Sequence, residues 1–191
     1  GTGIKSALIE CGAPDDVASY NIIDRSSVHT DGKQGRDRII ENICLAIGKY
    51  IDLADSAIIG VGSAGDIDDS CGVITYATNA LQGFTGLDLR KVLAERFGKR
   101  VNLINDAVAA LIGEAYVGSS LRGRPMMLTL GTGLGCAMIE DIDAPLGSGS
   151  VENIRLGHIE LHKDGRECKC GLKGCAEQYV SATGLKLNAG M

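Results

Sequence analysis

The stretch that decides the interpretation of this chain is Gly157-His158, followed by Cys168-Lys169-Cys170-Gly171-Leu172-Lys173-Gly174-Cys175-Ala176-Glu177. It places three thiols and one imidazole within eighteen residues, and its glycines let the backbone turn tightly between the thiols. Three cysteines and one histidine form a common closed, tetrahedral zinc shell. The spacing, H-x9-C-x-C-x4-C, differs from that of zinc fingers and ribbons, which need two separated C-x2-C-like pairs. The pattern predicts one zinc ion, and the alternative is a cluster of unpaired, reduced cysteines. The predicted ligands are His158, Cys168, Cys170 and Cys175.

Composition limits the classes of protein that are possible. With 191 residues, 45% of them hydrophobic, the chain can bury a core as one large domain or two small ones. A net charge of −5 without any run of Lys or Arg argues against a nucleic-acid partner. The apolar runs are far shorter than the roughly 18 residues of a membrane span, so we expect no membrane partner. Seven cysteines, an odd number, favour the reduced cytoplasm over an oxidised secreted framework.

Hydrophobic periodicity predicts alternating strands and helices. Apolar residues recur at three- and four-residue spacing over 37–51, which predicts an amphipathic helix. Short apolar runs beside glycine or turn residues predict strands. The predicted strands are 7–10, one or two within 17–28, 57–62, 101–104, and a hairpin of 126–130 with 136–139; the other predicted helices are 89–97, 107–116 and 175–183. This alternation predicts an α/β fold, and the break at 122–125 marks a candidate domain boundary.

The glycine-rich segment 131–135 (Gly-Thr-Gly-Leu-Gly) joins the two strands of the predicted hairpin. Glycines let a backbone approach an anion closely, and Thr132 adds a hydroxyl donor. The segment is not a Walker A loop, and it is not a Rossmann fingerprint because a strand is predicted to follow it. Taken alone, it is better read as a plain hairpin. A second turn at the N-terminus, Gly1-Thr2 with Lys5, favours phosphate binding for the pair.

The dipeptide Asn105-Asp106 lies where a predicted strand ends and a helix begins. Both residue types are preferred as helix N-caps, and a cap is the simplest interpretation. The carboxyl ends of strands also line ligand crevices in α/β folds, where a carboxylate can accept the proton of an attacking hydroxyl. Capping and catalysis are compatible at this position.

Taken together, these motifs resemble the signature of the ROK family (repressors, open reading frames and sugar kinases). The segment 157–177 is similar to its G-H-x9-C-x-C-G-x2-G-C-x-E motif, and Asn105-Asp106 resembles its catalytic pair. Residues 1–5 resemble the end of its first phosphate motif, and 130–135 its second phosphate loop. Each glycine-rich piece alone is weak evidence, but their order along the chain together with the cysteine motif is strong.

The resemblance implies an actin-like ATPase (RNase H-like) α/β fold of two lobes, with residues 1–120 in the first and 121–191 at the start of an incomplete second. It implies a glucokinase-type kinase that transfers phosphate from ATP, with Mg²⁺, to a hexose hydroxyl. Asp106 is then the general base, and the closed zinc shell is structural. Phosphate contacts are expected from Gly1, Thr2, Lys5, Gly131, Thr132 and Gly133, and sugar contacts from Gly65, Thr78, Asn79, Asn105, His158 and Glu177. Without the resemblance, the segments around Gly65 and Asn79 are equally well read as ordinary turns.

One departure from the family pattern concerns specificity. The family commonly has Glu three residues before the ligating histidine, whereas this chain has Arg155, a cation that accepts no hydroxyl proton. This difference keeps open the alternative of a non-catalytic sugar-binding module. A sugar-responsive transcriptional regulator is a second alternative, kept open by the missing N-terminus. A regulator would need a helix-turn-helix upstream of Gly1. The resemblance further implies sugar and ATP as small-molecule partners, a homodimer when the protein is full length, and segments at both ends that are missing from this sequence.

Overall fold

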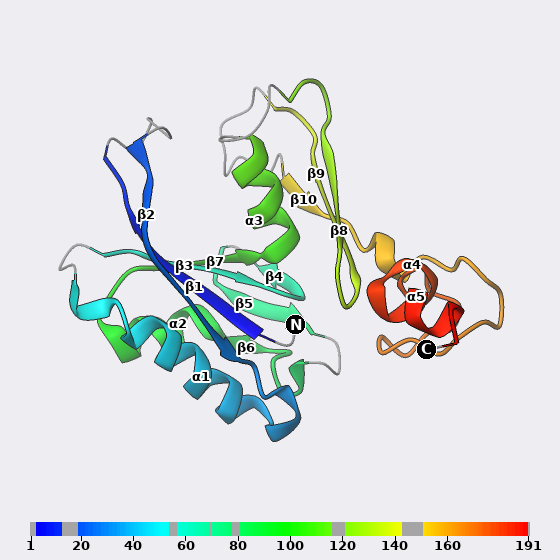
Figure 1. The fold of residues 1–191 in the computed structure, drawn as a ribbon, viewed down its shortest axis with the longest axis horizontal. Helices are drawn as coiled ribbons and strands as arrows, with labels where there is room; N and C mark the ends of the chain where they lie inside the picture. Colours follow the sequence, from blue (N-terminus) through cyan, green and yellow to red (C-terminus); the bar gives the residue numbers. More distant parts are fainter. Residues whose placement is uncertain are drawn as a thin grey trace. The chain divides into compact units, whose positions relative to one another are not determined.

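The computed structural model describes residues 3–12, 19–53, 57–68, 70–77, 81–115, 121–142 and 151–190. The chain divides into two compact units, Gly1–Ile104 and Asn105–Met191 (Figure 1). The boundary near residue 120 that we expect between the lobes stays a prediction. Four predicted site residues lie outside the described part of the chain: Gly1, Thr2, Thr78 and Asn79.

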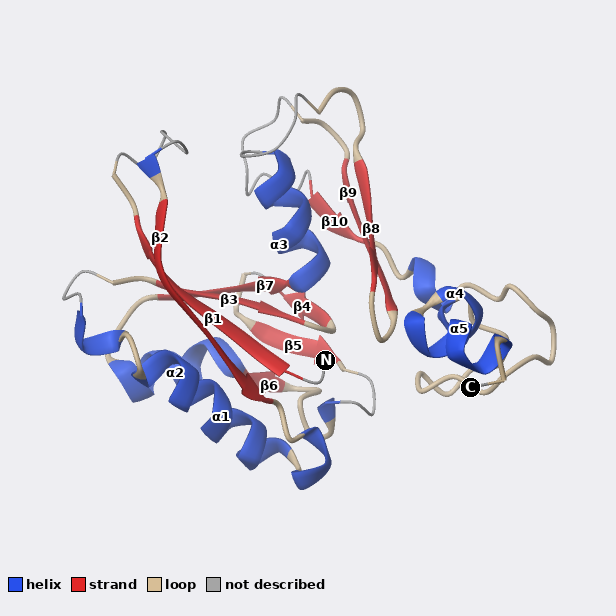
Figure 2. Ribbon diagram, viewed as in Figure 1, coloured by secondary structure: helices blue, strands red, loops and turns tan. Residues whose placement is uncertain are grey.

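The strands in the described part of the first unit form three small sheets (Figure 2). β1 (Gly3–Glu10) pairs antiparallel with β2 (Asn21–His29). β3 (Ile59–Ser63) pairs with β7 (Val101–Asn105). The third sheet is antiparallel and contains β4 (Asp66–Asp68), β5 (Val73–Tyr76) and β6 (Leu87–Asp88). The last three strands were not predicted, because they are only two to four residues long and too short for a clear period.

The α-helices described in the first unit are α1 (Arg36–Gly48) and α2 (Leu89–Phe97). α2 begins where the Asp88 side chain accepts the Lys91 N–H, and it ends at Gly98 in the left-handed conformation (φ 61°). Short 3-10 turns lie at Gly32–Gln34 and Ile51–Leu53. The core draws aliphatic side chains from both helices and from three strands, together with one phenylalanine. Its buried members are Ile39, Ile59, Ile74, Phe84, Leu89, Leu93, Val101 and Leu103.

The second unit begins with α3 (Asp106–Gly113), which packs on a three-stranded antiparallel sheet. The order in this sheet is β10 (Val151–Asn153), β9 (Leu134–Ile139) and β8 (Met126–Leu130). The β8–β9 hairpin confirms the predicted one, and its Leu130–Leu134 pair closes the glycine-rich turn. Small and aliphatic side chains from α3 and β9 form the contact. The buried ones are Ala107, Val108, Leu111, Cys136, Ala137 and Ile139.

The single helix predicted over 175–183 is wrong. The structure has two short helices there, α4 (Glu177–Val180) and α5 (Ala182–Asn188). Ser181 separates them because its backbone is extended (φ −71°, ψ 167°) and its hydroxyl accepts the Gly184 N–H. A buried serine at this position therefore starts a new helix instead of continuing the first one.

The other predicted elements are close to the observed ones. α2 has the predicted bounds, and α1 ends at Gly48 instead of residue 51. Lys5, expected in the turn before the first strand, lies inside β1 because that strand already begins at Gly3. Within the described residues, no helix combines the length and apolar character needed to cross a membrane.

Candidate metal centre and active site

A tightly hydrogen-bonded loop carries the four predicted metal ligands. Its ends are held by antiparallel bridges of Glu160 with Cys175 and of Glu167 with Lys173. Gly174 has φ 72°, and a Cβ there would fall on the carbonyl oxygen of His162. Gly171 also has a positive φ, 92°. Glycine is therefore required at Gly174, and the tight backbone predicted between the cysteines is present.

The four ligand atoms come together in this loop. The donor atoms of His158, Cys168, Cys170 and Cys175 all lie within 4.8 Å of one another. Nδ1 of His158 is 3.7 Å from Sγ of Cys168, and the sulfurs of Cys170 and Cys175 are 3.6 Å apart. A tetrahedral zinc shell with Zn–S bonds of about 2.3 Å places its sulfurs roughly 3.8 Å apart. The donor set and its spacing therefore fit a zinc ion.

Burial of Cys168 and Cys175 disfavours the thiolate form of their side chains. Burial, together with the neighbouring thiols of Cys170 and Cys168, raises the pKa of Cys175 to about 12. Burial also raises the pKa of Cys168. A metal that binds here must displace these protons, since zinc is ligated by thiolates.

Glu177 connects the metal loop with the glycine-rich turn. One carboxylate oxygen, Oε2, accepts the Leu134 N–H at 3.3 Å, and the other, Oε1, lies 3.4 Å from Sγ of Cys168. A Cβ on Gly133 would lie 2.6 Å from Oε2, so glycine leaves room for the carboxylate. The contact with Leu134 spans 43 positions of sequence and the contact with Cys168 spans nine, and neither was predicted.

The start of α5 also holds the glycine-rich turn. The Ala182 N–H donates to the Gly131 carbonyl at 2.9 Å. The Thr183 hydroxyl donates to the Thr132 carbonyl at 3.1 Å. The glycine-rich turn and the metal loop are therefore joined through the α4–α5 segment.

Asn105 and Asp106 have different roles at the start of α3. Oδ1 of Asn105 accepts the N–H groups of Ala107 (2.9 Å) and Val108 (3.1 Å), so Asn105 is the N-cap. Asp106 is exposed, and its Oδ1 accepts the Ala107 N–H at 2.9 Å. A Cβ on Gly135 would lie 3.3 Å from Cβ of Ala107. The helix that begins with Asp106 thus lies against the strand that follows the glycine-rich turn.

Two other predicted site residues, Lys5 and Gly65, lie in the described part of the first unit. Gly65 follows β3 with φ 105°, and a Cβ there would lie 2.5 Å from the Tyr76 carbonyl oxygen, so glycine is required. Lys5 is exposed on β1, opposite Ser27.

Arg155 is exposed just before the 3-10 turn Leu156–His158. Its carbonyl oxygen accepts the His158 N–H at 3.0 Å. The residue that departs from the family pattern is therefore bonded through its backbone to the predicted metal ligand.

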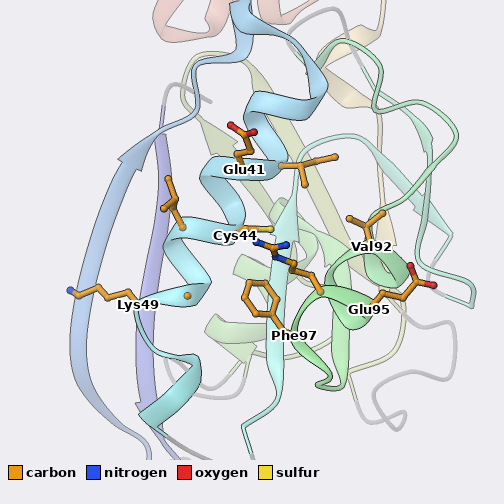
Figure 3. Close-up of a pocket in the computed structure, with 10 residues that line it drawn as sticks. Glu41, Cys44, Lys49, Val92, Glu95 and Phe97 are labelled. Atoms are coloured by element: carbon orange, nitrogen blue, oxygen red, sulfur yellow. The ribbon is translucent and has the colours of Figure 1, made fainter.

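A groove of about 990 Å³ lies between α1 and α2 of the first unit (Figure 3). Cys44 on α1 and Phe97 on α2 face the same space, whereas Lys49 points away from it toward the strands. Lys49 pairs with Asp24 at 2.6 Å. Among the predicted site residues that the structure describes, none lines the groove.

Three residues around the metal loop were missed from the sequence: Arg166, Gln178 and Tyr179. The Arg166 N–H donates to the Tyr179 hydroxyl at 2.9 Å, and the Arg166 guanidinium lies 4.9 Å from the centre of the Tyr179 ring. The side-chain amide of Gln178 donates to Sγ of Cys168. The sequence could have indicated them only by position: Arg166 is two residues before Cys168, and Gln178 and Tyr179 directly follow Glu177.

The fold places the chain among the α/β proteins of actin-like ATPase fold. The chain is similar to the structure of a ROK family glucokinase from Streptomyces griseus in complex with glucose and AMPPNP. The TM-score is 0.76 at 32% identity, over 88% of this chain and 53% of that one. It is also similar to an inorganic polyphosphate/ATP-glucomannokinase from Arthrobacter, with a TM-score of 0.71 at 26% identity, over all of this chain and 68% of that one. The predicted α/β, actin-like fold is confirmed.

The chain belongs to the ROK family, whose model matches residues 9–190. The glucokinase of Thermotoga maritima is 33% identical over 156 residues, 81% of this chain and 48% of the relative. The N-acetyl-D-glucosamine kinase of Aliivibrio fischeri is 32% identical over 162 residues, 78% of this chain and 52% of the relative. The chain therefore spans about half the length of these curated relatives.

Proposed function

We propose that the protein carrying this chain is an ATP-dependent sugar kinase of glucokinase type, a transferase of carbohydrate metabolism. The observation that carries the proposal is the position of Glu177, which contacts both the glycine-rich turn and the metal loop. A phosphate-binding turn and a sugar-binding carboxylate must lie close together in such an enzyme. A coupled assay of ADP release with a panel of hexoses and amino sugars tests the proposal on the intact protein. Absence of sugar-dependent ADP release across the panel would overturn it.

In this mechanism, each group has a separate task. Asp106 accepts the proton of the sugar hydroxyl while that oxygen attacks the γ-phosphorus in line, and the bond from phosphorus to the bridging oxygen breaks as ADP leaves. Backbone groups of Gly131 and Gly133, with the Thr132 hydroxyl, bind phosphate oxygens, and we assign the same role to Gly1, Thr2 and Lys5. Mg²⁺ would supply neutralisation of the phosphate charge.

The sugar contacts are assigned on chemical grounds. Glu177 accepts hydroxyl protons, and the ring nitrogen of His158 that faces away from the sulfurs donates to a hydroxyl. The other proposed contacts are Gly65, Thr78, Asn79 and Asn105. Zinc on four protein ligands has no open position for substrate, so its role is to hold the loop that carries His158 and precedes Glu177.

A Gly133→Ala variant tests the role of Glu177 in sugar binding. The added Cβ would meet the Glu177 carboxylate at 2.6 Å and displace it. Losing a hydrogen bond to a charged acceptor costs about 1.5–3 kcal/mol, so we expect the dissociation constant of the sugar to rise at least about tenfold. Calorimetric titration with sugar alone is the measurement. Gly131→Ala is the matched control, because nothing lies within 4 Å of a Cβ there. Equal sugar affinities of the two variants would refute the assignment of Glu177.

An Arg155→Glu variant tests sugar preference. A guanidinium offers donors and no acceptor, whereas a carboxylate there would accept a sugar hydroxyl proton. We expect this change to raise kcat/KM for a neutral hexose at least about tenfold. Sugars that carry an acetamido, phosphate or carboxylate group should change less. An unchanged profile across neutral, amino and acidic sugars would mean that Arg155 does not face the sugar, and an inactive wild type would favour the non-catalytic module.

Two further properties belong to this proposal. The reduced thiols of the metal loop suit a cytoplasmic protein. A homodimer of the intact protein follows from the family resemblance, and the mass of the purified protein in solution tests it.

A further inference from the structure

Gln178 lies in α4, and its side chain donates a hydrogen bond to a predicted metal ligand, Cys168. Its Nε2 lies 3.5 Å from Sγ of Cys168, and the side chain is half-buried. This distance is within the range of N–H···S hydrogen bonds. The contact is local in sequence, ten positions apart, but it joins the helix that carries Glu177 to the metal loop.

The position of Cys168 creates an electrostatic problem that such a donor relieves. Its sulfur lies 3.4 Å from Oε1 of Glu177. As a zinc ligand the sulfur is a thiolate, and a thiolate beside a carboxylate in a partly buried site is unfavourable. An amide N–H directed at the sulfur lowers the electron density that faces the carboxylate.

The backbone of Gln178 is held in place from the same loop. The Arg166 guanidinium donates to the Gln178 carbonyl at 2.8 Å. Arg166 precedes Cys168 by two residues, and its N–H is bonded to the Tyr179 hydroxyl. The backbone that carries the Gln178 side chain is thus held by contacts from the loop itself, and its amide donates to Cys168.

We propose that Gln178 is a positioning residue of the zinc centre, which donates to the Cys168 thiolate and allows Glu177 to remain beside it. This inference rests on the zinc site proposed above. Partners that hydrogen-bond a metal ligand typically change metal affinity by about 10–100-fold when they are removed.

The test compares Gln178→Met, Gln178→Glu and Asn188→Leu in the intact protein. Met keeps an unbranched chain of similar length and removes the donor, and Glu keeps the shape but replaces the donor with an acceptor. Asn188 is the matched control, because its amide also donates within the α4–α5 segment but to the Tyr179 carbonyl. Zinc affinity is measured by competition with a chromophoric chelator, and the sulfur-to-cobalt charge-transfer band is measured after loading with cobalt(II).

We expect Gln178→Met to weaken zinc binding about tenfold and to move the charge-transfer band to longer wavelength, since the thiolate lone pairs are no longer stabilised. Gln178→Glu should weaken zinc binding further, toward about 100-fold, and Asn188→Leu should match the wild type in both measurements. If the Gln178→Met variant does not fold, the zinc affinity and the band of the Gln178→Glu variant test the proposal. Zinc affinity within twofold of the wild type together with an unshifted band overturns the role of Gln178. A wild-type protein that takes up neither metal overturns the zinc centre itself.

Discussion

The Asp106→Asn variant of the intact protein is expected to lose about 10²–10⁴-fold in kcat, the usual contribution of a general base. Asparagine keeps the size and hydrogen-bonding reach of the side chain but does not accept the hydroxyl proton. The expected change lies in kcat and not in the fold, because the α3 cap is made by Asn105 and not by the Asp106 carboxylate alone. Sugar affinity should stay close to that of the wild type.

The measurement is a coupled ADP-release assay with glucose at saturating ATP. Glu114→Gln is the matched control, since it removes one exposed carboxylate from the other end of the same helix. It should retain the wild-type kcat. If the kcat of Asp106→Asn is within threefold of the wild-type value, Asp106 is not the general base and serves only at the start of α3.

The second large effect is expected from loss of the metal. The purified intact protein should contain one zinc per chain, and Cys175→Ala should abolish it, because this fully buried sulfur belongs to the predicted shell. Structural zinc contributes about 10–16 kcal/mol of apparent binding free energy in small zinc-finger peptides. If only 3 kcal/mol of this is lost here, the melting temperature should fall by roughly 6–12 °C. Kinase activity should fall with it, since His158 and Glu177 lie on or beside the loop.

Elemental analysis and thermal melting measure these two effects. Cys136→Ala is the control, because its sulfur is equally buried in β9 but lies outside the metal loop. Both variants remove one buried sulfur, so a difference in zinc content between them reports ligation. A metal-free protein that is fully folded and active would contradict the zinc centre.

Elements that are set by a few neighbouring residues, such as α2 and the cysteine motif, were predicted correctly from the sequence. α2 is bounded by Asp88, which caps its start, and by Gly98, whose left-handed conformation ends it. The cysteine motif is also local, since all four ligands lie on one loop closed by its own backbone hydrogen bonds. Where the signals are confined to a few neighbouring residues, the sequence is sufficient to place them.

Longer-range contacts were not predictable in the same way. The strands β4, β5 and β6 are stabilised by pairing with one another, and their own residues show no clear period. The break at Ser181 depends on a hydroxyl that bonds forward to Gly184 and on burial of that serine, neither of which composition reveals. Tertiary packing decided these elements.

The sequence by itself determined the family, the α/β fold, the four clustered metal ligands and the candidate base. Each of these depends on residue types at a fixed spacing. In a tight loop or at the end of a strand, residues at such a spacing lie close together in space. Only the tertiary structure assigned the α3 cap to Asn105 and brought Glu177 to Leu134 and Cys168. Those contacts depend on how a hairpin, a loop and a helix pack together, and spacing along the chain carries no information about a carboxylate that bonds to a backbone N–H 43 residues away.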